Sequence, residues 1–164
     1  MNVGPLRFGM SHQQTVAAME ARGVTSPTLQ AEPRHGVLTQ RADFRASTAP
    51  AWLPAVTLSY REPGILACVA VDALQGPQVW LDTLRLVGQV PSELAERVFD
   101  YVAEHGMSPA VSTEGDAVSD EPGFMLRAQR AGDVLLTRAF LVAPFDDWAG
   151  TMHDCLPSGE WSVR

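Results

Sequence analysis

Residues Val56 to Gly106 read VTLSYREPGILACVAVDALQGPQVWLDTLRLVGQVPSELAERVFDYVAEHG and predict the centre of the fold. Val56 to Arg61 alternates apolar with polar side chains, which is the period of a half-buried strand. Glu62-Pro63-Gly64 supplies turn residues, and Ile65 to Leu74 is apolar at nearly every position, as expected of a strand inside a sheet. After a second turn, Val79 to Val87 predicts a third strand.

A helix is predicted from Pro91 to His105, with Gly106 just past its end. Leu94, Val98 and Val102 recur at helical spacing and form one apolar face, while most of the charged side chains lie on the opposite face. A helix with one apolar face buries that face against a neighbouring layer. We therefore expect it to pack across one face of the sheet.

Upstream, Ser11 to Arg22 predicts a shorter helix that ends at Gly23. Ser11 and Gln14 have the spacing of a capping box, in which each side chain binds the backbone N–H of the other residue. The apolar face of this helix is modest, so we expect it at the edge of the core. Gly36 to Gln40 and Ala42 to Arg45 indicate two further short strands.

Downstream, two strands, Phe124 to Arg130 and Val134 to Val142, flank an Ala-Gly-Asp turn and predict a hairpin. The fold class expected for residues 1–164 is a single α+β domain with a mainly antiparallel sheet of about five strands. One main helix would pack on a face of this sheet and a second helix would lie at its edge. The tail from about residue 144 is not assigned to any element.

The composition limits the classes of partner. The net charge is −7, so the surface repels nucleic acid and anionic membranes, and an acidic surface suits a basic partner. All basic residues are arginines, which excludes a phosphate-binding loop with its lysine and a lysine Schiff base. Residues Met1 to Arg7 show no signal-peptide pattern, and Ile65 to Val71 is far shorter than the ~20 apolar residues of a membrane helix. A cytoplasmic location is expected.

Residues suited to catalysis or metal binding are sparse. His153-Asp154-Cys155 is the only local group of metal-ligand types, and no paired histidine or cysteine spacing accompanies it. The chain contains neither a G-x-S-x-G elbow nor a G-x-G-x-x-G loop. If a catalytic site exists, His153, Asp154 and Cys155 are its candidates, together with His12. We expect a protein without catalytic residues, metal or cofactor.

The segment around residues 114–121 is acidic and has two interpretations. It is either a solvated loop that supports solubility or a docking edge for a basic protein such as a toxin domain. On the second interpretation the partner-binding residues are Glu114, Asp116, Asp120 and Glu121.

Residues Arg7-Phe8-Gly9-Met10-Ser11-His12-Gln13-Gln14, with Val16 after them, resemble a strand-to-helix motif of the secreted β-lactamase inhibitory proteins of streptomycetes and of small outer-membrane assembly lipoproteins. The strand–turn–strand–helix block looks like that of small actinobacterial proteins of immunity-protein type. The resemblance implies a protein-binding module that neutralises a toxin by masking its surface. Two alternatives remain open: a module that binds a small molecule or an assembly partner in an apolar pocket between sheet and helix, or an enzyme of unrecognised type.

Overall fold

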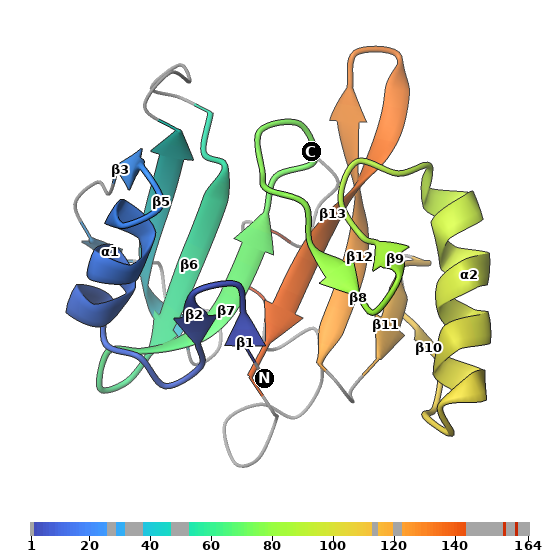
Figure 1. Ribbon diagram of the computed structural model, residues 1–164, viewed down its shortest axis with the longest axis horizontal. Coiled ribbons are helices and arrows are strands. Elements are labelled where there is room, and N and C mark those ends of the chain that lie inside the picture. Colours follow the sequence, from blue (N-terminus) through green and yellow to red (C-terminus); the bar gives the residue numbers. More distant parts are fainter. Residues whose placement is uncertain are drawn as a thin grey trace.

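The computed structural model describes residues 2–25, 29–31, 38–46, 53–112, 115–119, 123–143, 156 and 160. Within these ranges nine strands form one antiparallel sheet (Figure 1). In spatial order eight of them are β10 (Ala110–Val111), β11 (Ala117–Ser119), β12 (Phe124–Ala131), β13 (Val134–Val142), β7 (Ile65–Val71), β6 (Val56–Arg61), β5 (Leu38–Ala46) and β3 (Val24–Thr25), and β4 (Gln30–Ala31) also pairs with β5.

Two short hairpins and two helices complete the described part of the chain. The first hairpin joins β1 (Asn2–Val3) to β2 (Leu6–Arg7), and the second joins β8 (Trp80–Leu81) to β9 (Leu84–Arg85). Helix α1 (His12–Glu20) lies near β3, and helix α2 (Pro91–Glu104) lies near β11 and β12, so the helices stand at opposite ends of the sheet (Figure 1).

The hairpin of β6 and β7 forms as the sequence predicts. Gly64, with φ of 96°, adopts the left-handed conformation that glycine tolerates best, and its N–H donates to the carbonyl of Arg61. The bounds of β6 and β13 equal the predicted ones. Strand β7 ends at Val71, earlier than predicted, because the Asp72 carboxylate accepts the N–H groups of the next residues and turns the chain.

The sheet buries side chains on both faces. The first face carries the larger core, which it shares with the two hairpins and with the apolar sides of the helices at its ends. The sheet residues of this core include Val56, Leu58, Tyr60, Val69, Val71, Phe124, Leu126, Ala139 and Leu141. The second face carries a smaller core with Leu156, built from Ala67, Cys68, Ala70, Val118, Met125, Phe140, Val142 and Ala143. Burial on both faces explains why β7 is apolar along almost its whole length.

The second face also holds charged side chains that are buried or nearly so. Arg138 Nη1 donates to Glu160 Oε2 over 2.6 Å, and Arg41 Nη1 lies 3.9 Å from Glu160 Oε1. Arg41 Nε and Thr57 Oγ1 both donate to Asp43 Oδ1, over 2.9 and 2.7 Å. Glu160 therefore connects to two strands, β13 and β5, that are not neighbours in the sheet.

The predicted sheet of about five strands is wrong, since the described residues contain a nine-stranded sheet. Strands such as β3, β4 and β10 are only two residues long, too short to show alternation. The strand predicted over Val79 to Val87 is also wrong. It is split into β8 and β9, because Asp82 has φ of 51° and turns the chain back on itself outside the main sheet.

The predicted packing of the main helix is wrong as well. Helix α2 does not cover a face of the sheet; it lies at the end formed by β11, β12 and β13. Residues 86–89 explain this placement, because they are hydrogen-bonded to Thr137 of β13 just before the helix begins. With one helix at each end, the middle of the first face is left to the two hairpins.

Candidate ligand-binding pocket

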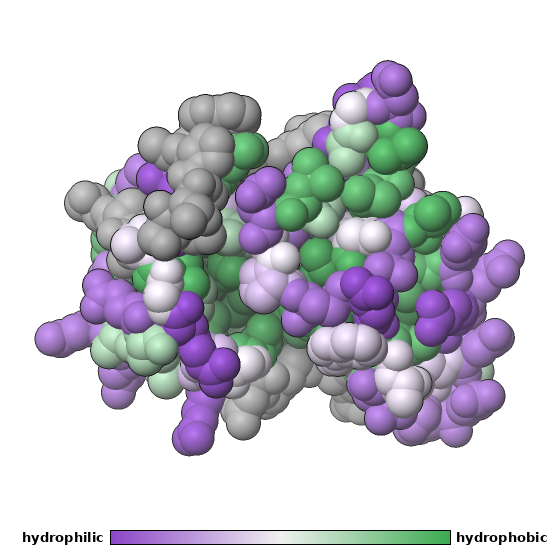
Figure 2. All heavy atoms as spheres, turned by 45° about the horizontal axis from the view of Figure 1, so that its top comes forward, coloured by the Kyte–Doolittle hydropathy of each residue, from purple (hydrophilic) through white to green (hydrophobic). Residues whose placement is uncertain are grey.

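The middle of the first face is hollowed into a pocket of about 860 Å³. Figure 2 shows the hollow between the two halves of the molecule, with hydrophobic atoms at its bottom. Its described lining is Val3, Gly4, Pro5, Leu6, Met19, Arg22, Val24, Ala55, Val56, Val69, Val71, Gln75, Gly76, Pro77, Gln78, Val79, Trp80, Leu81, Leu86, Phe124 and Leu141. Most of these side chains are apolar, so the pocket favours an apolar occupant.

The floor of the pocket belongs to the sheet. Phe124 of β12 is paired with Leu141 of β13, and Leu141 is paired with Val69 of β7. Val71 is paired with Val56 of β6, which continues the floor toward α1. These side chains are buried members of the first core, and their strands are joined by continuous backbone hydrogen bonds. The floor is therefore a rigid apolar surface.

One wall of the pocket is the loop of residues 72–79, which is held by side-chain hydrogen bonds. Asp72 Oδ1 accepts the N–H groups of Leu74 and Gln75, and Asp72 Oδ2 accepts from Gln129 Nε2 over 2.7 Å. Gln78 binds both backbone groups of Val87 with its amide. These bonds tie the loop to β12 and to the segment after β9, so this wall is preformed.

Gly76 is required in this wall for a steric reason. A Cβ atom at this position would meet the carbonyl oxygen of Asp72 and Cγ1 of Val71 at 2.4 Å, closer than real contacts allow. The Gly76 N–H donates to the same Asp72 carbonyl over 3.0 Å. The loop can fold tightly against the end of β7 only because residue 76 lacks a side chain.

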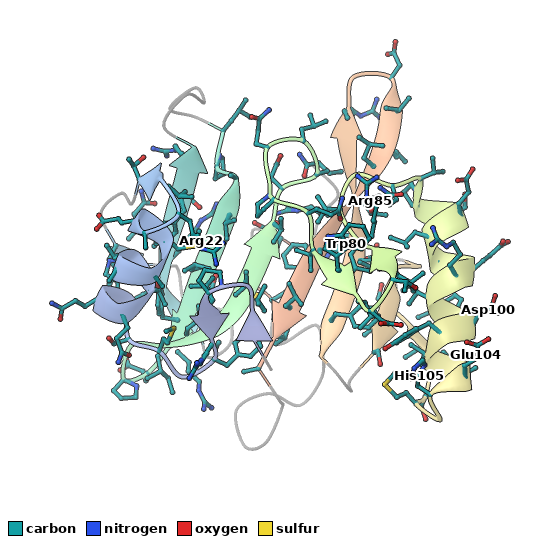
Figure 3. All side chains as sticks on the ribbon, viewed as in Figure 1. Arg22, Trp80, Arg85, Asp100, Glu104 and His105 are labelled. Atoms are coloured by element: carbon teal, nitrogen blue, oxygen red, sulfur yellow. The ribbon has the colours of Figure 1, made fainter. Side chains whose placement is uncertain are left out.

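The opposite wall comes from the β1–β2 hairpin and from the end of α1. Met19 of α1 is buried against the first core, and Arg22 and Val24 follow the helix. Figure 3 shows Arg22 on the α1 side and Trp80 on the β8 side of the molecule. Trp80 is 58% exposed, and the Arg85 guanidinium lies 5.9 Å from its ring centroid. Arg22 is the only charged residue among the described residues that line the pocket.

A buried hydrogen-bonded group fixes α1 to the sheet beside this wall. Thr15 Oγ1 donates to the His12 carbonyl, so Tyr60 Oη must donate to Thr15 Oγ1 over 2.6 Å. Tyr60 Oη then accepts from His12 Nδ1, which lies 3.2 Å away and carries the proton. Burial raises the pKa of Tyr60 to about 12, so the phenol stays a donor at neutral pH.

Burial also lowers the pKa of His12 below 6.5, and this makes stability depend on pH. The unfolded chain binds a proton more readily than the folded one, so the contribution of His12 to stability is complete above pH 6.5 and is lost as the pH falls through the folded pKa. Urea titrations at pH 5 and pH 7 give the free energy of unfolding of each protein. We expect this free energy to decrease more between pH 7 and pH 5 for the wild type than for His12→Gln. Equal losses for both proteins would contradict this assignment.

Of the four predicted partner-binding residues, the structure describes only Asp116. Glu114, Asp120 and Glu121 lie outside the described residues. Asp116 is only 9% exposed, and its Oδ2 forms an ion pair with Arg127 Nε over 3.3 Å. The Asp116 N–H also donates to Ser112 Oγ over 3.1 Å. The Asp116 carboxylate thus neutralises a buried arginine.

Of the predicted catalytic candidates, the structure describes only His12. His153, Asp154 and Cys155 lie outside the described residues, and His12 is engaged with Tyr60. Among the residues that are described, no group of three or more histidine, cysteine, aspartate or glutamate side chains is arranged to hold a metal ion. Within the same ranges neither helix has the length and apolar character needed to cross a membrane.

Sequence reasoning raised an apolar pocket only as an alternative and placed it between sheet and helix. The pocket instead lies over the sheet, between the β1–β2 side and residues 75–81. Its lining comes from residues 3–6, 19–24, 55–56, 69–81, 86, 124 and 141, which are far apart in the chain. The one local signal is Gly76-Pro77 followed by the exposed Trp80.

Comparisons with models of protein families, with curated proteins and with solved structures give no match. The fold and the pocket define the class of protein that the structure shows: an antiparallel sheet with two helices at its ends and an apolar pocket on one face. What the protein does must therefore be inferred from the chemistry of the pocket.

Proposed function

We propose that this protein is a binding module that takes a small, mainly apolar molecule into the pocket on the first face of its sheet. The observation that carries the proposal is the pocket itself, which has a volume of about 860 Å³ and an apolar floor on four strands. Ligand pockets of proteins commonly enclose about 300–1,000 Å³ and are lined mainly by hydrophobic side chains with a few polar groups.

The energetics of burial support this occupant. Each methylene that leaves water for an apolar site contributes about 0.8 kcal/mol, or about a fourfold gain in affinity. A medium-length alkyl chain in contact with Val69, Phe124 and Leu141 gains this contribution at every methylene that the pocket covers. Affinity should therefore rise with chain length until the pocket is full.

The pocket is also prepared for binding. Its floor is part of the main sheet, and its wall of residues 72–79 is tied down by Asp72, Gln78 and Gln129. A site whose walls are already ordered does not have to order them when the ligand enters, so more of the burial energy appears as affinity.

The toxin-inhibitor hypothesis stays a prediction. It rests on the acidic segment, of which Glu114, Asp120 and Glu121 lie outside the described residues. The ion pair between Asp116 and Arg127 gives this carboxylate a role inside the protein. No contact among the described residues supports masking of a toxin over binding in the pocket.

Ala55→Leu tests the pocket directly. Ala55 is buried and lines the pocket, so the larger side chain extends into the space that the ligand would use. We expect the affinity for the neutral dye Nile red, followed by its fluorescence, to fall by about tenfold or more. The matched control Ala103→Leu makes the same change at an exposed position of α2 and should leave the affinity unchanged.

Circular dichroism distinguishes loss of the pocket from loss of the fold, because Ala55→Leu should retain the wild-type spectrum. A folded Ala55→Leu protein that binds Nile red as tightly as the wild type would contradict the proposed function. Equal weakening by Ala55→Leu and Ala103→Leu would contradict it as well, because the dye would then bind elsewhere.

A further inference from the structure

We infer that the ligand of this pocket is an anionic amphiphile, a single carboxylate on an apolar chain, with the carboxylate bound by Arg22. This inference rests on the proposed function and adds the chemistry of the head group to it. The exposed guanidinium of Arg22 supports the inference, because it lies at the α1 side of a pocket whose other described lining residues are uncharged.

The described lining of the pocket carries a positive charge, whereas the whole chain is negatively charged. The chain has a net charge of −7, yet among the described lining residues no carboxylate is present and one arginine is. Arg22 therefore attracts an anion in the pocket and repels a cation. Burial of a carboxylate without such a partner would be strongly unfavourable, so the head group belongs at Arg22 and the chain on the floor.

Arg22 is available for this role. Its backbone N–H donates to the carbonyl of Met19 at the end of α1, which holds the start of the side chain beside the pocket. Among the residues that the structure describes, none forms an ion pair with its guanidinium, whereas Arg41, Arg127 and Arg138 are engaged in internal ion pairs. In Figure 3 Arg22 lies toward α1 and Trp80 lies toward β8, with β7 between them in the view.

The single positive charge of the described lining favours a carboxylate head group over a phosphate. A guanidinium binds a carboxylate with two parallel hydrogen bonds, and one arginine neutralises one negative charge. A phosphate monoester carries up to two charges at neutral pH and would leave one unpaired at this site. The apolar floor, formed by the row Phe124–Leu141–Val69, then accepts the alkyl chain.

Isothermal titration of the full chain with dodecanoate, dodecanol and dodecyl phosphate, each below its micelle concentration, tests the inference. For the wild type at low salt we expect dodecanoate to bind about three- to tenfold more tightly than dodecanol, because the charge pair is partly exposed to solvent. Arg22→Gln should abolish this preference and Arg22→Glu should reverse it, while both variants keep the affinity for dodecanol. The control Arg7→Gln removes the same charge from β2, outside the lining, and should keep the preference.

The possible results separate the two proposals. Binding of dodecanol and dodecanoate with equal affinity would overturn the assignment of the head group and leave the apolar pocket in place. A preference for dodecanoate that persists in Arg22→Gln, or tighter binding of dodecyl phosphate than of dodecanoate, would also overturn it. Failure of all three compounds to bind would contradict the proposed function, and with it this inference.

Discussion

Val98→Asp is expected to unfold the protein. Val98 is fully buried on the inner face of α2, in the first core together with Leu94 and Val102. An aspartate there would place an unpaired carboxylate in apolar surroundings, at a cost of several kcal/mol, which is comparable to the whole stability of a domain of about 5–15 kcal/mol. Circular dichroism and thermal denaturation should show a chain without a cooperative transition.

A valine-to-aspartate substitution at the start of this helix should instead stabilise the protein. Val90 is the N-cap of α2, is 47% exposed, and has extended backbone angles, but valine offers no oxygen to the first free N–H groups. Val90→Asp supplies that oxygen and a negative charge at the helix N-terminus, so we expect a gain of about 0.5–1 kcal/mol. A stable Val98→Asp protein would contradict the packing of α2 described above.

Glu160→Ala is expected to lower the free energy of unfolding by about 3–5 kcal/mol, because it leaves a buried arginine without its carboxylate. Glu160 is 1% exposed and is joined to Arg138, which is 6% exposed. Urea denaturation gives the free energy. Glu104→Ala, which removes an exposed carboxylate from α2, should change it by no more than about 0.5 kcal/mol.

A double variant shows whether the loss comes from the uncompensated charge. Replacing both Arg138 and Glu160 by methionine removes both charges and keeps apolar volume on the second face, so most of the stability lost in Glu160→Ala should return. If Glu160→Ala is as stable as the wild type, residue 160 does not connect β13 to β5 in solution.

The long hairpins of the sheet were predictable from local patterns. Strand β6 alternates apolar and polar residues, and the turn after it contains Pro63 and Gly64, so its bounds are the predicted ones. The turn between β12 and β13 contains Gly132, with φ of 66°, and β13 likewise has its predicted bounds. Period and turn chemistry act within a few residues, which is why one sequence suffices to recognise them.

The edges of the sheet and the position of α2 were not predictable in the same way. Two-residue strands such as β3 and β4 exist because β5 offers backbone partners, not because of their own side chains. The apolar face of α2 was predicted correctly, since Leu94, Val98 and Val102 are buried. What that face meets depends on the hydrogen bonds between residues 86–89 and Thr137. These bonds join positions 48 and 51 residues apart, so no local pattern encodes them.

The candidate site likewise depends on contacts between residues that are far apart in the sequence. Asp116 lies in an acidic stretch for which the sequence suggests a docking edge, but its side chain is 9% exposed and is paired with Arg127 of β12. The pocket depends on residues from both halves of the described chain, and its shape follows from where α1 and α2 do not cover the sheet. In the pocket wall, only a glycine at position 76 fits against Asp72 and Val71.

The central claim is that the pocket on the first face binds an apolar ligand, and methyl NMR during a dodecanol titration tests it most directly. The predicted result is saturable shifts for the methyl groups of Val69, Val71 and Leu141, which line the pocket, with none for Val118 and Val142 in the core of the second face. Shifts that concentrate on Val118 and Val142, or the lack of any saturable shift in the pocket, would contradict the account.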